Sequence, residues 1–135
     1  MRTKKTELYV HLIWGVWGGE PALASLDEAR LHEVISEIAA AMSVDALAAG
    51  GTETHLHVLA RLPSTLPVDH WASHLKAASA QFVSKALGDE RHFRWAAAYA
   101  AFSVSKTDLI GVTEYIRRQR EIHSAGAEDA AMELE

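Results

Sequence analysis

Two histidines separated by one residue, His55 and His57, carry the side chains best suited to binding a metal ion. Side chains two residues apart on a β-strand point to the same face, so both imidazoles can reach one divalent cation. Ordinary half-exposed strand histidines form the same triplet, and for the triplet alone they are the simpler explanation. A metal site therefore requires a further donor from another part of the chain.

The segment from Tyr115 to Gln119 offers such a donor. Residues four apart on a helix share a face, which places a phenol beside an amide oxygen that can complete a site of two nitrogens and one oxygen. A tyrosine can also act as a covalent nucleophile. Taken alone, the segment is explained more simply as a surface helix with a half-buried tyrosine. The histidine pair and the Tyr115–Gln119 segment therefore indicate a metal site only when they are considered together.

Hydrophobic spacing predicts the elements that must position these residues. Residues 7–14 are rich in aromatic and branched side chains, and residues 44–49 and 54–62 flank a glycine pair, so we expect one strand and, later, a hairpin. Between them, Ser25 and Glu28 form a capping-box pattern, which predicts a helix capped by Ser25. The apolar face of that helix comprises Leu31, Val34, Ile35, Ile38 and Met42.

The second half of the chain again predicts helices that alternate with a strand. We expect a second helix from Pro67 to about Gly88, a fourth strand over residues 99–105, and a third helix capped by Thr107. The order predicts an α+β fold, a ferredoxin-like antiparallel sheet (βαββαβ) with an added C-terminal helix that carries Tyr115. We expect a single domain over residues 1–127 and a loosely ordered acidic tail over residues 128–135.

Composition narrows the possible classes of protein. The chain has no cysteine, which excludes a disulfide framework, a thiolate zinc site and a cysteine nucleophile and favours a cytoplasmic location. No segment has the pattern of a signal peptide or a membrane span. The formal net charge is −5, whereas nucleic-acid binders are usually basic. Four of the 18 acidic residues lie in the last eight positions, so residues 1–127, with 13 basic and 14 acidic side chains, are nearly neutral.

Five motifs occur in a fixed order, and their set resembles a known family. They are Tyr9–Trp14 (YVHLIW), the HLHVL strand from His55, Leu75-Lys76 with Ser79, Tyr99–Ser105 (YAAFSVS) and Tyr115–Gln119 (YIRRQ) followed by His123. Over residues 7–130 the chain resembles the single-tyrosine HUH transposases, particularly the REP-associated tyrosine transposases and the insertion-sequence transposases.

The resemblance implies a function and assigns roles to residues. It implies a transposase-like endonuclease and strand transferase for single-stranded or hairpin DNA, which forms a 5′-phosphotyrosine intermediate. Tyr115 would be the nucleophile, and His55, His57 and Gln119 would bind Mg²⁺ or Mn²⁺. It also implies a homodimer, often with the tyrosine helix of one subunit completing the metal site of the other. We expect the three ligands to converge on one open face of the sheet.

DNA contacts are expected from basic and aromatic side chains. The basic residues that could line a groove are Lys76, Arg91, Arg94, Arg117, Arg118 and Arg120. Aromatic side chains that could stack on bases are Tyr9, Trp14, Trp17 and Trp95. Taken singly, core tryptophans and solvated arginines explain these residues equally well.

Two other functions remain open. A non-catalytic descendant would keep the fold and dimer and bind nucleic acid or a protein without cutting. The acidic balance favours it, as do Thr54, where the family usually has aspartate, and Ala98 and Ala100, where it usually has glycine. An unrelated ferredoxin-like protein that binds a small molecule would require the motif set to be coincidence.

Overall fold

A four-stranded antiparallel sheet organises the molecule, which is described by a computed structural model over residues 4–88 and 92–134. Its strands are β1 (Leu8–Gly15), β2 (Asp45–Gly51), β3 (His55–Leu62) and β4 (Ala100–Val104). They lie in the order β2-β3-β1-β4, and every neighbouring pair is antiparallel. With the helices between them, this is the predicted ferredoxin-like βαββαβ arrangement, so the prediction of fold class is confirmed.

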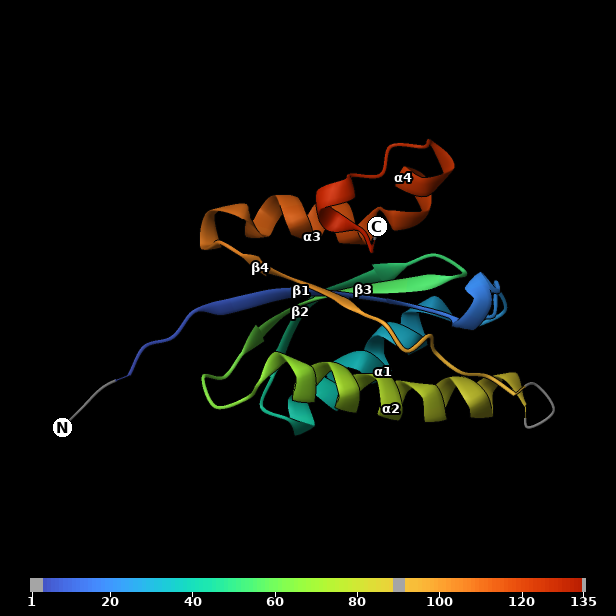
Figure 1. The fold of residues 1–135 in the computed structure, drawn as a ribbon, viewed down its shortest axis with the longest axis horizontal. Coiled ribbons are helices and arrows are strands. Elements are labelled where there is room, and N and C mark those ends of the chain that lie inside the picture. Colours follow the sequence, from blue (N-terminus) through green and yellow to red (C-terminus); the bar gives the residue numbers. More distant parts are fainter. Residues whose placement is uncertain (1–3, 89–91, 135) are drawn as a thin grey trace.

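Helices α1 (Glu28–Ala41) and α2 (Val68–Leu87) lie side by side on one face of the sheet (Figure 1). Between them and the sheet lies the main apolar core, to which β3 contributes Leu56, Val58 and Ala60. The cap predicted for α1 was wrong by two residues. Asp27, not Ser25, caps it, because its carboxylate accepts a hydrogen bond from the amide of Arg30 at 3.3 Å.

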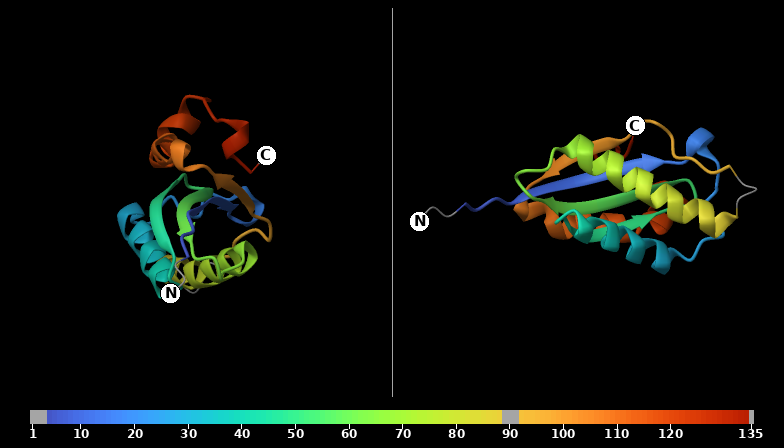
Figure 2. Two further views of the ribbon diagram at one scale, coloured as in Figure 1. Left: turned by 90° about the vertical axis from the view of Figure 1, so that its left-hand side faces the viewer. Right: turned by 90° about the horizontal axis from the view of Figure 1, so that it is seen from below.

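The opposite face of the sheet is covered, not open as predicted. Helices α3 (Leu109–Arg117) and α4 (Gln119–Ser124) lie across it, and the chain beyond α4 folds back toward the sheet (Figures 1 and 2). The predicted single helix is thus two, with Arg118 between them. A short 3₁₀ turn, η2 (Lys106–Asp108), precedes α3, and Thr107 within it does not cap the helix. The turns η1 (Trp17–Gly19) and η3 (Ala130–Met132) complete the elements.

A glycine in β2 lets α3 lie close to the sheet. A Cβ atom built at Gly50 would overlap the carbonyl oxygen of Ile116 in α3. Ile116 is fully buried and packs with Tyr9, Ala48 and Leu59 in a small second core. The close approach brings the last turn of α3 down to the strand that carries the histidine pair. No helix in the described part of the chain is both long and apolar enough to cross a membrane.

Candidate active site

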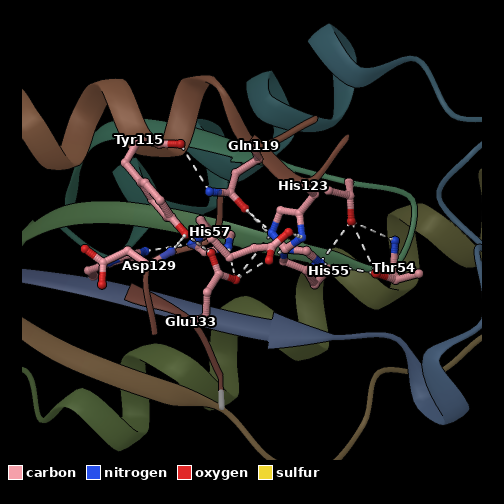
Figure 3. A network of polar contacts seen from close by, with 11 residues as sticks. Thr54, His55, His57, Tyr115, Gln119, His123, Asp129 and Glu133 are labelled. Atoms are coloured by element: carbon pink, nitrogen blue, oxygen red, sulfur yellow. Dashed lines mark hydrogen bonds and ion pairs between the residues drawn. The ribbon is translucent and has the colours of Figure 1, made fainter. Parts of the chain in front are cut away.

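Strand β3 presents His55 and His57 to the face covered by α3 and α4 (Figure 3). The alternation of the strand decides this, since Leu56 and Val58 point into the main core. His57 is completely buried and His55 is partly buried. Burial is the main cause that lowers the pKa of His55, so its imidazole is held in the neutral form that binds metals.

A histidine on β1 orients His57. Nε2 of His11 lies 2.8 Å from Nδ1 of His57, and the two buried rings share a hydrogen bond. Burial, and then the neighbouring His57, lower the pKa of His11 to about 4, so His11 is neutral at pH 7. Neutral His11 can accept the Nδ1 proton of His57 and leave Nε2 of His57 free to bind a cation. Sequence reasoning missed this role, although the alternation of Tyr9, His11 and Ile13 toward the same face was a usable signal.

Two threonine hydroxyls hold the outer nitrogen of His55. Oγ1 of Thr52 lies 2.9 Å from Nδ1 of His55, and Oγ1 of Thr54 lies 3.2 Å from the same atom. Thr54 stands where the resembled family usually has aspartate. A hydroxyl can orient an imidazole as a carboxylate does, so this departure leaves His55 correctly aimed.

Tyr115 lies in the last turn of α3 and Gln119 begins α4, and both side chains point toward the histidine pair (Figure 3). The break at Arg118 does not separate them, because Nε2 of Gln119 donates to the backbone oxygen of Tyr115 at 3.1 Å. This bond turns Oε1 of Gln119 toward the imidazoles, 3.2 Å from Nε2 of His55 and 3.0 Å from Nε2 of His123. The structure therefore brings together all four residues singled out as nucleophile and ligands.

The acidic tail contributes a fifth polar group, Glu133, which sequence reasoning did not single out. Its Oε1 lies 3.7, 3.4 and 3.5 Å from Nε2 of His55, His57 and His123, respectively. Its Oε2 accepts a short hydrogen bond from the hydroxyl of Tyr115. The hydroxyl also accepts a hydrogen bond from the amide of Asp129 at 3.0 Å. One carboxylate thus joins the phenol to the imidazoles.

These contacts set the protonation of the tyrosine and the glutamate. Burial and then the hydrogen bond to Glu133 raise the pKa of Tyr115 to about 12. Burial opposes ionisation of Glu133, but its close contacts with the imidazole of His57, the hydroxyl of Tyr115 and the imidazole of His123 lower its pKa to about 2. At neutral pH the site therefore holds a protonated phenol against an ionised carboxylate.

One atom of the cluster supports a metal site directly. Nε2 of His57 is buried and makes no well-formed hydrogen bond among the described residues, although Oε1 of Glu133 lies 3.4 Å away. A buried polar atom without a partner is costly unless a ligand satisfies it. The atom points at the cluster formed by His55, His123 and Glu133, whose donor atoms lie within 4.8 Å of one another and of it. The residues present therefore fit a divalent cation.

The residues predicted to contact DNA lie outside this cluster. Nζ of Lys76 donates to the backbone oxygens of residues 96, 97 and 98, at 2.7 to 3.4 Å. Arg118 pairs with Glu121, and Arg120 pairs with Glu28 and Glu53. Exposed Arg94 stacks on Trp17, with its guanidinium carbon 3.8 Å from the ring centroid, and Arg117 is exposed on α3. Arg91 lies outside the described residues.

Of the aromatic side chains predicted to stack on bases, one remains available. Trp17 is 53% exposed, whereas Tyr9, Trp14 and Trp95 are buried in the two cores. The prediction was therefore wrong for these three residues. Tyr9 and Trp14 lie on β1 and face the two cores, and Trp95 packs edge-on against Trp14, which aromatic character alone does not reveal.

The model of a known family, described as transposase IS200 like, matches residues 4–119. The chain belongs to the IS200-like transposase family. No curated protein matches its sequence. Among solved structures, a candidate transposase from Deinococcus radiodurans R1 is similar with a TM-score of 0.67 and 22% identity, over 86% of this chain and 93% of that one. A REP-associated tyrosine transposase bound to a REP hairpin is similar with a TM-score of 0.63 and 12% identity, over 95% of this chain and 74% of that one. At these identities the two likenesses show a shared fold.

Proposed function

We propose that this IS200-like transposase cuts and rejoins single-stranded or hairpin DNA through Tyr115, with Mg²⁺ or Mn²⁺ bound by His55, His57 and Gln119. One observation carries the proposal, namely that the phenol and the imidazoles meet at a single carboxylate in one buried site. Family membership supports it, and so does the REP hairpin in the similar transposase structure.

Each residue has a distinct task in this reaction. A divalent cation, when bound, neutralises charge on the phosphate and supplies the Lewis acid that a weak phenol nucleophile needs. His55 and His57 provide its nitrogen donors, and His11 keeps His57 in the tautomer that leaves Nε2 free. Gln119 provides an oxygen and, through its bond to the Tyr115 backbone, fixes the tyrosine relative to that oxygen.

The bond changes balance without another reactant. The phenolic oxygen of Tyr115 attacks phosphorus, a tyrosine–phosphate ester forms, and the bond from phosphorus to the 3′-oxygen breaks. In the resting site the phenolic hydroxyl donates a hydrogen bond to Glu133, which can take the proton as the phenol attacks and give it to the departing 3′-oxygen. Reversal by another 3′-hydroxyl joins strands with no consumption of ATP, because the ester keeps the bond energy.

A cleft beside the histidines gives a strand of DNA a path to the site. It has a volume of about 740 Å³, and its lining includes Gly15, Ala98, His55, His123 and Glu133. Gly15 pairs with His55 across the sheet, so the absence of a side chain there keeps this end of the cleft open. We propose that the phosphate to be cut enters along this cleft.

In this proposal Tyr115 attacks a phosphate bound at the metal site of its own chain, because the Tyr115 hydroxyl and the imidazole of His57 both contact the same Glu133. We also propose a homodimer, which would pool the arginines of two subunits along one DNA path. Light scattering at micromolar concentration tests the dimer. A strict monomer would refute the dimer and leave the site within one chain intact.

Covalent trapping tests the function. Protein, Mn²⁺ and a labelled library of single-stranded hairpins are incubated and separated on denaturing gels. We expect a slowly migrating protein–DNA adduct from the wild-type chain, none from Tyr115→Phe, and unchanged DNA binding by that variant, which loses only the attacking oxygen. His57→Ala should lose both metal affinity and the adduct.

Binding of nucleic acid without cleavage is the second function that an observation favours. The tail occupies the site, and Lys76, Arg118 and Arg120 are engaged within the chain. Wild-type protein that binds hairpins but forms no adduct with Mn²⁺ on any of them would establish this second function and refute the first.

A further inference from the structure

We propose that His123 and Glu133 bind the same cation as His55 and His57, which makes a four-donor site that prefers a first-row transition ion such as Zn²⁺ over Mg²⁺. The inference rests on the metal site in the proposed function, keeps its two histidines, and replaces the amide oxygen of Gln119 with His123 and Glu133 as the remaining donors. Both added donors lie beyond residue 119, where the match to the family model ends.

The spacing of the donor atoms supports four ligands. In a tetrahedral site with bonds of about 2.0–2.1 Å, neighbouring donor atoms are about 3.3–3.4 Å apart. Oε1 of Glu133 lies 3.4, 3.5 and 3.7 Å from the Nε2 atoms of the three histidines. Three edges of the tetrahedron are therefore within a few tenths of an ångström of that value, and the other three, between imidazole nitrogens, are no longer than 4.8 Å.

The outer nitrogen of each histidine has its own partner, which is the usual arrangement around a bound metal. His57 is held by His11 and His55 by Thr52. For His123 the partner is a second tail carboxylate, since Oε1 of Glu128 lies 3.3 Å from Nδ1. A proton on Nδ1 directed to Glu128 leaves Nε2 of His123 free to bind the cation.

The donor chemistry selects the ion. Imidazole nitrogens suit Zn²⁺ and similar transition ions, whereas Mg²⁺ demands octahedral oxygen ligands and keeps several waters. Three nitrogens and one carboxylate oxygen are a donor set of the zinc type. Nε2 of His57, which is completely buried and without a hydrogen bond among the described residues, points into this set. A buried nitrogen that makes no well-formed hydrogen bond and faces a carboxylate oxygen at 3.4 Å is consistent with a cation bound between the two atoms.

Metal titration of the full chain without DNA tests the inference. By calorimetry we expect Zn²⁺ to bind at least tenfold more tightly than Mg²⁺, and Glu133→Gln and His123→Asn each to weaken Zn²⁺ binding at least tenfold. Glu114→Gln, which removes the same charge from an exposed position on α3, should leave affinity unchanged. Co²⁺ should give the intense visible absorption of a four-coordinate ion, and this absorption should weaken in Glu133→Gln. Circular dichroism of each variant confirms folding.

Two results separate this inference from the proposed function. Equal Zn²⁺ affinity and equal Co²⁺ absorption in the wild type and Glu133→Gln would overturn the four-donor site, even if hairpin adducts form with Mn²⁺. Zn²⁺ binding that depends on both Glu133 and His123 would support the site, even if no adduct ever forms and the proposed nuclease function fails.

Discussion

The imidazole of His57 can offer Nε2 to a cation only while its other nitrogen keeps a proton. His11 is the residue that makes this possible, because it is buried, neutral and 2.8 Å from Nδ1 of His57. A bond of this kind fixes both the tautomer and the ring orientation of a metal ligand. His11 is therefore a positioning residue, and its loss should affect metal binding more than a purely structural substitution would.

We expect His11→Leu to destabilise the metal-free protein by about 1–3 kcal/mol, because Nδ1–H of His57 loses its buried acceptor. Affinity for Mn²⁺ should fall by about 10- to 100-fold, the usual effect of losing the partner of a ligand. Thermal unfolding and calorimetry measure the two effects. His11→Gln, which keeps an acceptor oxygen, should recover much of the metal affinity.

His74→Ala, at an exposed position on α2, is the matched control and should change neither quantity. Unchanged Mn²⁺ affinity in His11→Leu would show that His57 needs no partner on β1.

Residue spacing predicted part of the site and missed the rest for a physical reason. His55 with His57, and Tyr115 with Gln119, follow the periods of a strand and a helix, and each pair does lie on one face in the structure. Glu133 belongs to an alanine-rich acidic segment without any period, so nothing local marks it. Only the return of the chain over α3 brings its carboxylate to Tyr115.

At the scale of elements, the distance between α3 and β2 governs how the site is assembled. Because Gly50 has no side chain, the carbonyl group of Ile116 can lie against it, in space that any Cβ atom would overlap. Tyr115 and Gln119 flank Ile116, so the same contact sets how far the phenol and the amide lie from the histidines on β3.

We expect Gly50→Ala to force α3 away from the sheet and to cost about 1–3 kcal/mol of stability, as overpacking usually does. Metal affinity should fall as well, because Gln119 moves away from the imidazoles. Chemical denaturation and Mn²⁺ titration measure the two effects.

Gly111→Ala provides the control within α3. A Cβ atom at Gly111 meets no atom within 4 Å, and alanine favours a helix over glycine by about 1 kcal/mol. This variant should be as stable as the wild type or more so. If Gly50→Ala behaves like Gly111→Ala, the close approach has no role in building the site.

Element periodicity predicted the sheet, both core helices and the α3 strip of Leu109, Val112 and Ile116, whose spacings match the observed packing. It did not predict the break at Arg118 or the covered sheet face. Both depend on long-range packing of α4 and the tail, and helical spacing continues unbroken through residues 115–123.

At the scale of the whole molecule, charge limits how DNA is held. The net charge is −5, and Lys76, Arg118 and Arg120 already satisfy acceptors within the chain. Of the described residues predicted to contact DNA, Arg94 and Arg117 are exposed and form no ion pair in the described ranges, so both remain available to phosphate.

We expect a shallow dependence of DNA affinity on salt, with log affinity falling by about 1–2 per decade of salt for two or three phosphate contacts on a single strand. Arg117→Gln should reduce this slope by about 0.7, whereas Arg118→Gln should not. Fluorescence anisotropy at several salt concentrations measures the slope. A slope of about 4 or steeper would mean that the internal pairs open to bind DNA.

The two faces of the sheet differ greatly in the number of buried apolar side chains. We therefore expect the sheet with α1 and α2 to be one cooperative unit, and α3, α4 and the tail to be a second, less stable one. Most buried apolar side chains lie under α1 and α2, whereas the α3 face has only the small cluster around Ile116. Helices of nine and six residues are marginal without tertiary support. Regions with few buried contacts open locally, at a lower free energy than the whole domain.

Amide hydrogen exchange should therefore be faster in α3, α4 and the tail than in β1 and β3, and mass spectrometry of peptides from each segment can measure it. Equal protection of α4 and β3 would show one cooperative unit. With unequal protection, His11, His55 and His57 stay on the layer that remains folded, while Tyr115, Gln119 and Glu133 belong to the layer that opens. The nucleophile could then leave the imidazoles and return to them by a local fluctuation that leaves the sheet intact.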